Sequence, residues 1–140
     1  MSLSNVRHFG RDEILAAVSM DAAVESQSSV LRALAEGTAA MGPRALLDYG
    51  GNTAFSYLAR ASAAGWPVVK LGSVNPGNAD AGLPLIHALV LIMDRVSGAV
   101  VATADGEAVT LLRTPAASLA AARALVDADR KSTRLNSSHT

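Results

Sequence analysis

The stretch KLGSVNPGNADAGLPLIHALVLIMDRVSGAVVATADGEAVTLLR, from Lys70 to Arg113, decides the fold. Its short apolar runs, separated by Gly, Pro, Asn and Asp, are typical of strands joined by tight turns. We therefore predict three successive strands, at 67–74, 85–94 and 99–104. Asn75-Pro76-Gly77-Asn78 predicts a type II turn, because proline presets the second turn position and glycine suits the third. A hairpin turn is expected at Ser97-Gly98.

Two isolated cations, Lys70 and Arg113, bracket this stretch. Each follows an apolar run, Trp66-Pro67-Val68-Val69 before the lysine and Leu111-Leu112 before the arginine. A lone cation in such a place is usually paired or extends its charged end to solvent. The residues alone therefore favour a structural role over a ligand-binding one for both.

Upstream of this stretch we expect two helices and two strands. Residues 11–18 predict a short helical turn, and Ser19 or Asp21 can cap a longer helix to Glu36, with Gly37 as its stop. Two short strands are expected on either side of a glycine turn, at 44–49 and 52–58.

Downstream, Asp105-Gly106 predicts a turn and 108–113 a helical segment. Thr114-Pro115 supplies an N-cap and a first-turn proline for a further helix to about Val126. The fold class expected from these elements is α+β: amino-terminal helices, a mostly antiparallel sheet with some unpaired edges, and a carboxyl-terminal helix.

The composition limits the core and the partners. Half of the 140 residues are hydrophobic but only 4% are aromatic, so we expect a core of closely spaced aliphatic side chains. Zero net charge, with no basic run before the last dozen residues, argues against nucleic acid and anionic membranes. Residues 1–8 lack a secretory-signal pattern, and the apolar run 83–93 is too short to span a bilayer. We expect a soluble cytoplasmic protein.

The last twelve residues differ in composition from the rest. The segment 129–140, DRKSTRLNSSHT, is polar and basic and follows an alanine-rich helix without a cap or turn signal. It resembles the in-frame translation of a common sequencing adapter, although a polar chain end would have a similar composition. We therefore expect 1–128 to be a native but truncated domain and 129–140 to be a non-native tail.

A series of motifs, K…NPGN…GLP…D..SG..VA..DG..VT.LRT..A, resembles the amino-terminal domain of the ornithine cyclodeaminase/mu-crystallin family. The resemblance covers roughly Asp12 to Val126, and the motifs are specific as an ordered set. It implies a substrate-binding and dimerisation domain for a small amino or imino acid, working as a homodimer. NAD or NADP would be bound mainly by a Rossmann half with a G-x-G-x-x-G fingerprint, which is missing from this chain.

The resemblance assigns roles to four residues. Arg44 and Arg113 would hold the substrate carboxylate by charge-assisted hydrogen bonds. Lys70 would add a donor near the carboxylate and the imine nitrogen, and three cations around one anion should lower its pKa enough to suit a catalytic proton transfer. Arg113 and Thr114 would lie next to the bound cofactor. On the residues alone, a surface ion pair accounts for Arg44 about as well.

The chain departs from the family at Tyr57-Leu58-Ala59-Arg60. Relatives commonly carry Met-Pro in place of Ala59-Arg60, and ornithine-specific members carry an acidic residue in place of Tyr57. A phenol lacks the negative charge that a distal ammonium needs. The resemblance thus implies hydride transfer involving a substrate without a distal cation, and a cyclic ketimine such as pyrroline-2-carboxylate is favoured over ornithine cyclodeamination.

Two alternatives are a mu-crystallin-like domain that binds a ligand without chemistry and a short dimerisation module. The full-length protein would be an ornithine cyclodeaminase- or ketimine reductase-like enzyme, whereas this chain alone is expected to be inactive.

His87 lies in a predicted apolar strand and is expected to be a core or interface histidine with its hydrogen bonds satisfied. No second histidine or carboxylate stands at ligand spacing, so we predict no metal site.

Overall fold

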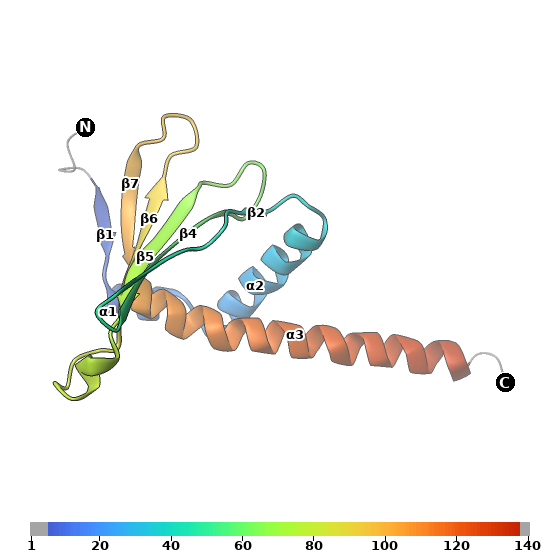
Figure 1. The fold of residues 1–140 in the computed structure, drawn as a ribbon. Coiled ribbons are helices and arrows are strands. Elements are labelled where there is room, and N and C mark those ends of the chain that lie inside the picture. Colours follow the sequence, from blue (N-terminus) through green and yellow to red (C-terminus); the bar gives the residue numbers. More distant parts are fainter. Residues whose placement is uncertain (1–5, 138–140) are drawn as a thin grey trace.

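The computed structural model describes residues 6–137, which form one sheet with three α-helices (Figure 1). Within these residues the sheet has seven strands in the order β1-β7-β6-β5-β4-β2, and β3 pairs with β4 beside β2. The strands are β1 Arg7–Phe9, β2 Ala40–Met41, β3 Ala45–Tyr49, β4 Asn52–Arg60, β5 Val68–Val74, β6 Ile86–Met93 and β7 Val100–Asp105. All pairs are antiparallel except β1 with β7. The predicted α+β class is confirmed.

Strand β5 lies at the centre of the sheet, between β4 and β6. Lys70 in β5 is directly opposite Tyr57 of β4 and Val90 of β6. Because side chains alternate between the two faces of a strand, these three residues share one face. The five strands that the sequence predicted are all present. The strands β1 and β2, of three and two residues, were missed, since they are too short to show an alternating pattern.

The first two helices, α1 (Arg11–Ala17) and α2 (Met20–Ala35), begin and end as predicted. The hydroxyl of Ser19 accepts a hydrogen bond from the Ala22 N–H at 3.2 Å, so Ser19 is the N-cap of α2. Gly37 follows the helix with φ of 72°, a left-handed conformation that favours glycine.

The third helix, α3 (Gly106–Ser137), corrects two predictions. Asp105 and Gly106 do not form a turn, because α3 starts directly after β7 and the Asp105 carboxylate accepts the Ala108 N–H at 2.7 Å. Thr114 and Pro115 do not start a new helix, since α3 passes through them without interruption. Proline removes one backbone hydrogen bond from α3, but the buried Ala108 and Ala116 anchor the helix on both sides of it.

The predicted type II turn at 75–78 is also wrong. Pro76–Ala79 form a turn of 3-10 helix, and Gly77 does not have positive φ. Asn78 determines this shape, because its side-chain amide donates to the Pro84 carbonyl at 2.8 Å while its own carbonyl accepts the Leu83 N–H at 2.9 Å. The left-handed glycine of this loop is Gly82, with φ of 67°.

The buried residues of the described chain are small, as the composition predicted. They comprise one valine and six alanines besides Gly106: Ala23, Val24, Ala102, Ala104, Ala108, Ala116 and Ala120. Helices α2 and α3 meet through such residues, which lets their backbones approach closely. The start of α3 approaches β6 just as closely, because a Cβ added to Gly106 would lie 2.7 Å from the Ala88 backbone.

The two faces of the sheet differ in what covers them. Helix α3 lies against β5, β6 and β7, on the face that carries Lys70, Ala88 and Ala104 (Figure 1). No helix is seen against the opposite face in the described residues, and Leu47, Leu58 and Leu71 on that face are 68%, 50% and 40% exposed. This open apolar face is what a sheet that packs against a second layer requires.

Helix α3 extends well beyond the rest of the fold (Figure 1). Its segment Gly106–Asp127 is long and apolar enough to cross a membrane by length and composition alone. The same segment contains the buried Ala116 and Ala120, which pack on α2, and it carries Arg113 beside Lys70. Docking against α2 and the sheet buries only part of the segment, since Leu119, Leu125 and Val126 stay 43%, 73% and 54% exposed.

Candidate functional site

The side chain of Lys70 crosses from the sheet to α3. It leaves the middle of β5 on the helix-covered face, and its Nζ donates a hydrogen bond to Oγ1 of Thr110. Both side chains are half-buried. Lys70 therefore joins the two layers of the fold at the place where α3 crosses the centre of the sheet.

The pKa of Lys70 is lowered from its ordinary value, first because burial desolvates the ammonium and second because the Arg113 guanidinium lies nearby. This direction agrees with the sequence prediction, and Arg113 is one of the two neighbouring cations that the prediction invoked. A lower pKa brings the amine closer to a range where it can accept or release a proton.

Arg113 lies on α3 one turn after Thr110. Residues three and four apart share a helix face, so Thr110, Arg113 and Thr114 form one polar edge along α3. The structure thus brings Arg113 to Lys70 as expected, but within a continuous helix. The predicted helix junction beside Arg113 does not exist, so no free backbone N–H groups surround it there.

Arg44 comes immediately before β3 and reaches toward β4. Its guanidinium carbon lies 5.2 Å from the centre of the Tyr57 ring, a cation–π contact. Tyr57 is stacked on Phe55, with ring centres 5.1 Å apart. Since Tyr57 is also the β4 partner of Lys70, its ring has the arginine on one side and the β5 lysine on the other.

Thr110 is the polar residue of this site that the sequence analysis missed. It stands three residues before Arg113 inside the motif VT.LRT. Helical spacing alone would have placed it on the same face as Arg113. What could not be read from the sequence is that this face lies over Lys70, because that contact depends on how α3 crosses the sheet.

Arg44, Lys70 and Arg113 all lack an ion pair with a described carboxylate. Ion pairs join Arg7 to Glu13, Arg11 to Glu107 and Arg123 to Asp21, and in the part of the chain that the structure describes none involves Arg44, Lys70 or Arg113. Lys70 and Arg113 repel one another, and no described carboxylate offsets the repulsion. A small anion bound between them would do so.

His87 is exposed and lies opposite Ser73 on the uncovered face of the sheet, and its ring makes no hydrogen bond with the described residues. The predicted core position is therefore wrong, whereas the predicted interface position stays a prediction. The side-chain alternation of β6, fixed by Lys70 on β5, turns it away from α3. Within the part of the chain that the structure describes, no three His, Asp or Glu side chains group closely enough to hold a metal ion.

The described chain is thus a small sheet domain in which two cations without carboxylate partners, Lys70 and Arg113, lie where a long helix packs on the sheet. The family model of the ornithine cyclodeaminase/mu-crystallin family matches residues 9–135, and the chain belongs to that family. The predicted membership is thereby confirmed. The match reaches past residue 128 and α3 continues to Ser137, so the non-native origin of 129–140 stays a prediction.

Three relatives define the comparison further. The alanine dehydrogenase of Archaeoglobus fulgidus is 31% identical over 115 residues, which are 82% of this chain and 35% of that protein. An archaeal alanine dehydrogenase dimer with bound NAD has a TM-score of 0.75 and 28% identity, covering 80% of this chain and 34% of its own. The Δ1-pyrroline-2-carboxylate reductase of Thermococcus litoralis, in complex with NADH and L-proline, has a TM-score of 0.76 and 26% identity, covering 81% and 36%.

This chain therefore spans about a third of the length of the relatives that it matches. These relatives are dehydrogenases and reductases of amino and imino acids, and two of them have NAD or NADH bound in their structures.

Proposed function

We propose that this chain is the substrate-binding part of an NAD(P)-dependent amino or imino acid oxidoreductase. The substrate we favour is a cyclic ketimine carboxylate, such as pyrroline-2-carboxylate, rather than ornithine. One observation carries the proposal: Lys70 and Arg113 lie together on the helix-covered face, each without a carboxylate partner in the described chain.

In this proposal the substrate carboxylate bridges Arg44 and Arg113. A guanidinium can give a carboxylate two parallel hydrogen bonds, which fix the orientation of the planar C=N–carboxylate group. Lys70 donates to the carboxylate and stands near the imine nitrogen, where its lowered pKa suits proton transfer. Together the three cations bind the anion and present one face of its C=N bond.

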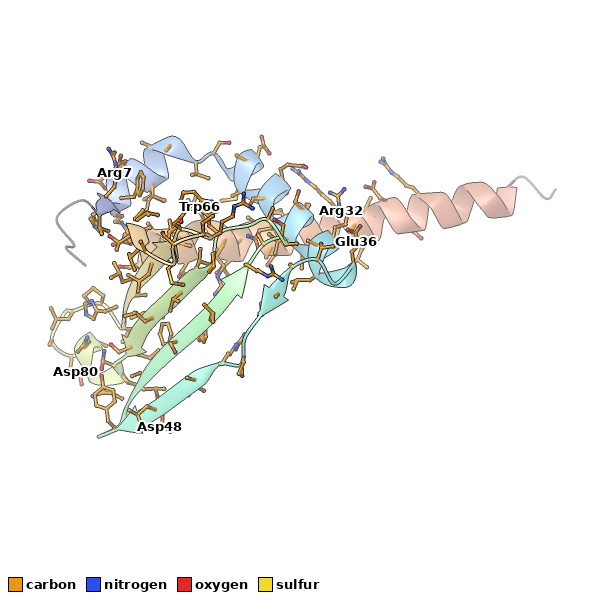
Figure 2. The ribbon with its side chains drawn as sticks, turned by 90° about the horizontal axis from the view of Figure 1, so that it is seen from above. Arg7, Arg32, Glu36, Asp48, Trp66 and Asp80 are labelled. Atoms are coloured by element: carbon orange, nitrogen blue, oxygen red, sulfur yellow. The ribbon has the colours of Figure 1, made fainter. Side chains whose placement is uncertain are left out.

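Tyr57 supports the choice of substrate. It occupies the place between Arg44 and Lys70, and it contributes an aromatic surface without negative charge. Two acidic residues of the sheet region, Asp48 and Asp80, lie at the end away from α3 (Figure 2). A substrate with a distal ammonium would find no carboxylate partner at Tyr57, whereas a cyclic apolar side chain can pack on its ring.

Within residues 6–137, the start of α3 does not offer a free phosphate site. At the β7–α3 junction the helix N-terminus is occupied by the Asp105 carboxylate, which accepts the Ala108 N–H and would repel a phosphate. We propose that NAD or NADP, which supplies or accepts the hydride, is bound mainly outside residues 6–137. Arg113 and Thr114 are the residues here that would adjoin it.

We also propose that two copies associate through the open face of the sheet. The exposed Leu47, Leu58 and Leu71 on that face support this, as does the dimer described for the archaeal alanine dehydrogenase. The same apolar face also supports a second candidate function, that of a dimerisation domain without catalysis.

Binding and turnover separate these functions. The chain should bind pyrrole-2-carboxylate, a stable planar analogue of the cyclic ketimine, and the Arg113→Gln variant should bind it at least tenfold more weakly. A protein carrying this domain together with its cofactor-binding half should oxidise NADPH or NADH with pyrroline-2-carboxylate. Binding without turnover would leave the ligand-binding alternative, and absence of both would leave the dimerisation domain.

A further inference from the structure

The hydroxyl of Thr110 has a fixed direction. Its Oγ1 donates to the Gly106 carbonyl at 2.7 Å, one turn earlier in α3. A threonine hydroxyl has one hydrogen and two lone pairs, so with this hydrogen committed Oγ1 can only accept from other groups. The bond to Lys70 therefore has Lys70 Nζ as donor, and it uses one of the three ammonium hydrogens.

The height of Thr110 above β5 is set by backbone contact. Gly106 is buried, and a Cβ at this position would lie 2.7 Å from both the backbone carbon and the Cβ of Ala88. The first turn of α3 therefore presses against β6 without an intervening side chain. Because Thr110 stands four residues later on the same helix face, its hydroxyl is held at a defined place over the neighbouring strand.

Lys70 needs such an acceptor to stay where it is. Arg113 repels its ammonium, and burial deprives the ammonium of water. The lysine side chain has four flexible carbons, so it could relieve both effects by turning its charged end toward solvent. Among residues 6–137, the contact that opposes this movement is the hydrogen bond to Thr110.

We propose that Thr110 is a positioning residue for Lys70: it holds the ammonium beside Arg113 and leaves two ammonium hydrogens free for an anionic ligand. Thr110 touches neither the ligand nor the reacting atoms in this proposal and acts only through Lys70. The identity of the ligand, a small carboxylate, rests on the proposed function. The holding of Lys70 can be tested without any ligand.

The sequence permits a direct observation of Lys70. Lysine occurs only at positions 70 and 131, so Lys131→Arg leaves one lysine in the chain. In that background, NMR of the chain labelled with ¹³C,¹⁵N-lysine follows the Lys70 titration in the parent and in Thr110→Ser and Thr110→Val. Valine keeps the branched shape and removes the acceptor, whereas serine keeps the acceptor.

The positioning role predicts the direction in which the Lys70 titration midpoint should move. If Thr110 holds Lys70, its loss in Thr110→Val frees the side chain, so the Lys70 midpoint should rise toward an ordinary lysine and its signals should sharpen. Thr110→Ser should behave like the parent. An unchanged midpoint in Thr110→Val would overturn the proposal. A midpoint that moves to lower pH would also overturn it, because Lys70 would then have stayed in place without its acceptor.

A double-mutant cycle with Arg113 supplies the second readout. In the parent, Arg113→Gln should raise the Lys70 midpoint, because it removes a nearby like charge. In the Thr110→Val background the same change should have little effect, since a released Lys70 is no longer close to Arg113. Equal effects in both backgrounds would contradict the positioning role. Thr110→Ala serves as the acceptor-free variant if Thr110→Val does not fold.

Binding of pyrrole-2-carboxylate distinguishes this proposal from the proposed function. Thr110→Val should weaken binding about tenfold and Thr110→Ser less than about twofold. If the parent chain binds no carboxylate, the proposed function fails while the titration still decides the role of Thr110. If the parent binds it and Thr110→Val binds equally well, the positioning role fails and the function stands.

Discussion

Arg113 on α3 lies close enough to Lys70 on β5 to lower the pKa of the lysine, and neither side chain is paired with a carboxylate in residues 6–137. Two like charges on packed elements weaken a fold unless something offsets them. Thr110 binds one of them, but it brings no negative charge. In the proposed function, an anion bound between the two cations would supply the missing negative charge.

The first prediction concerns that affinity. Arg113→Gln should weaken carboxylate binding by about 10- to 100-fold, because a charge-assisted bidentate contact is replaced by a neutral amide. Isothermal titration with pyrrole-2-carboxylate would measure the change. Arg95→Gln is the matched control: Arg95 lies in the exposed turn between β6 and β7 and should bind the ligand like the parent. Equal losses in both variants would point to a general charge effect.

The second prediction concerns stability and pH. The folded-state pKa of Lys70 lies below its unfolded value, so between the two the unfolded chain holds more protons and stability should rise with pH. Below the folded-state pKa, Lys70 is charged in both states, and the full cost of burying its charge lowers the free energy of unfolding. Lys70→Met should therefore raise the melting temperature at pH 7. The difference in melting temperature between this variant and the parent should shrink as the pH increases toward the pKa of Lys70 in the unfolded chain. Lys131→Arg is the control for loss of a lysine.

Thermal unfolding followed by circular dichroism between pH 6 and pH 10 would test this. A Lys70→Met chain that is less stable than the parent at every pH would contradict the pKa argument. Such a result would mean that the bond to Thr110 contributes more to stability than desolvation and Arg113 remove.

The third prediction concerns the packing beneath the site. A Cβ at Gly72 would lie 2.2 Å from the His87 carbonyl oxygen and 2.9 Å from the Phe55 ring, so β5 and β6 would have to separate. Gly72→Ala should lower the free energy of unfolding by about 3 kcal/mol. Gly77→Ala is the control, because its Cβ would meet nothing within 4 Å and its φ is not positive. Urea unfolding of both variants would measure the difference.

The sheet could be predicted from the sequence because its signals are local. Apolar runs bounded by Gly, Pro and Asn gave every strand from β3 to β7, and Ser19 and Gly37 gave both ends of α2. Local signals misled at Pro115, where proline is usually a helix start. There the burial of Ala108 and Ala116 on either side keeps α3 continuous, and burial depends on tertiary contacts that no local pattern contains.

The candidate site was predictable only in part for the same reason. Lys70 and Arg113 are noticeable because each ends an apolar run, and the family resemblance added Arg44 and Thr114. The neighbours that define their chemistry, Thr110 and Tyr57, come from the crossing of α3 over β5 and from the β4–β5 register. The charged residues could be identified from the sequence, whereas their contacts could be identified only from the three-dimensional structure.

The fourth prediction concerns the open face of the sheet. Leu71→Glu should dissociate the proposed dimer, because it would bury a carboxylate in an apolar interface. Leu31→Glu is the matched control, since Leu31 on α2 is 46% exposed against 40% for Leu71 but lies away from the sheet. Sedimentation velocity at several concentrations would report the association state. A monomeric parent chain would contradict the dimer outright.

The fifth prediction concerns Tyr57. Tyr57→Phe keeps the ring under Arg44 and should change carboxylate binding by less than about twofold, whereas Tyr57→Leu should weaken it roughly two- to fivefold, as expected for an exposed cation–π contact. Tyr57→Glu should have a different effect: it supplies a carboxylate that can pair with a distal ammonium, so binding should shift from L-proline toward L-ornithine. Competition titrations of the two amino acids would measure the ratio. If Tyr57→Glu and Tyr57→Leu changed that ratio equally, the charge at this position would not determine the choice of substrate, and the preference for a cyclic ketimine would lose its support.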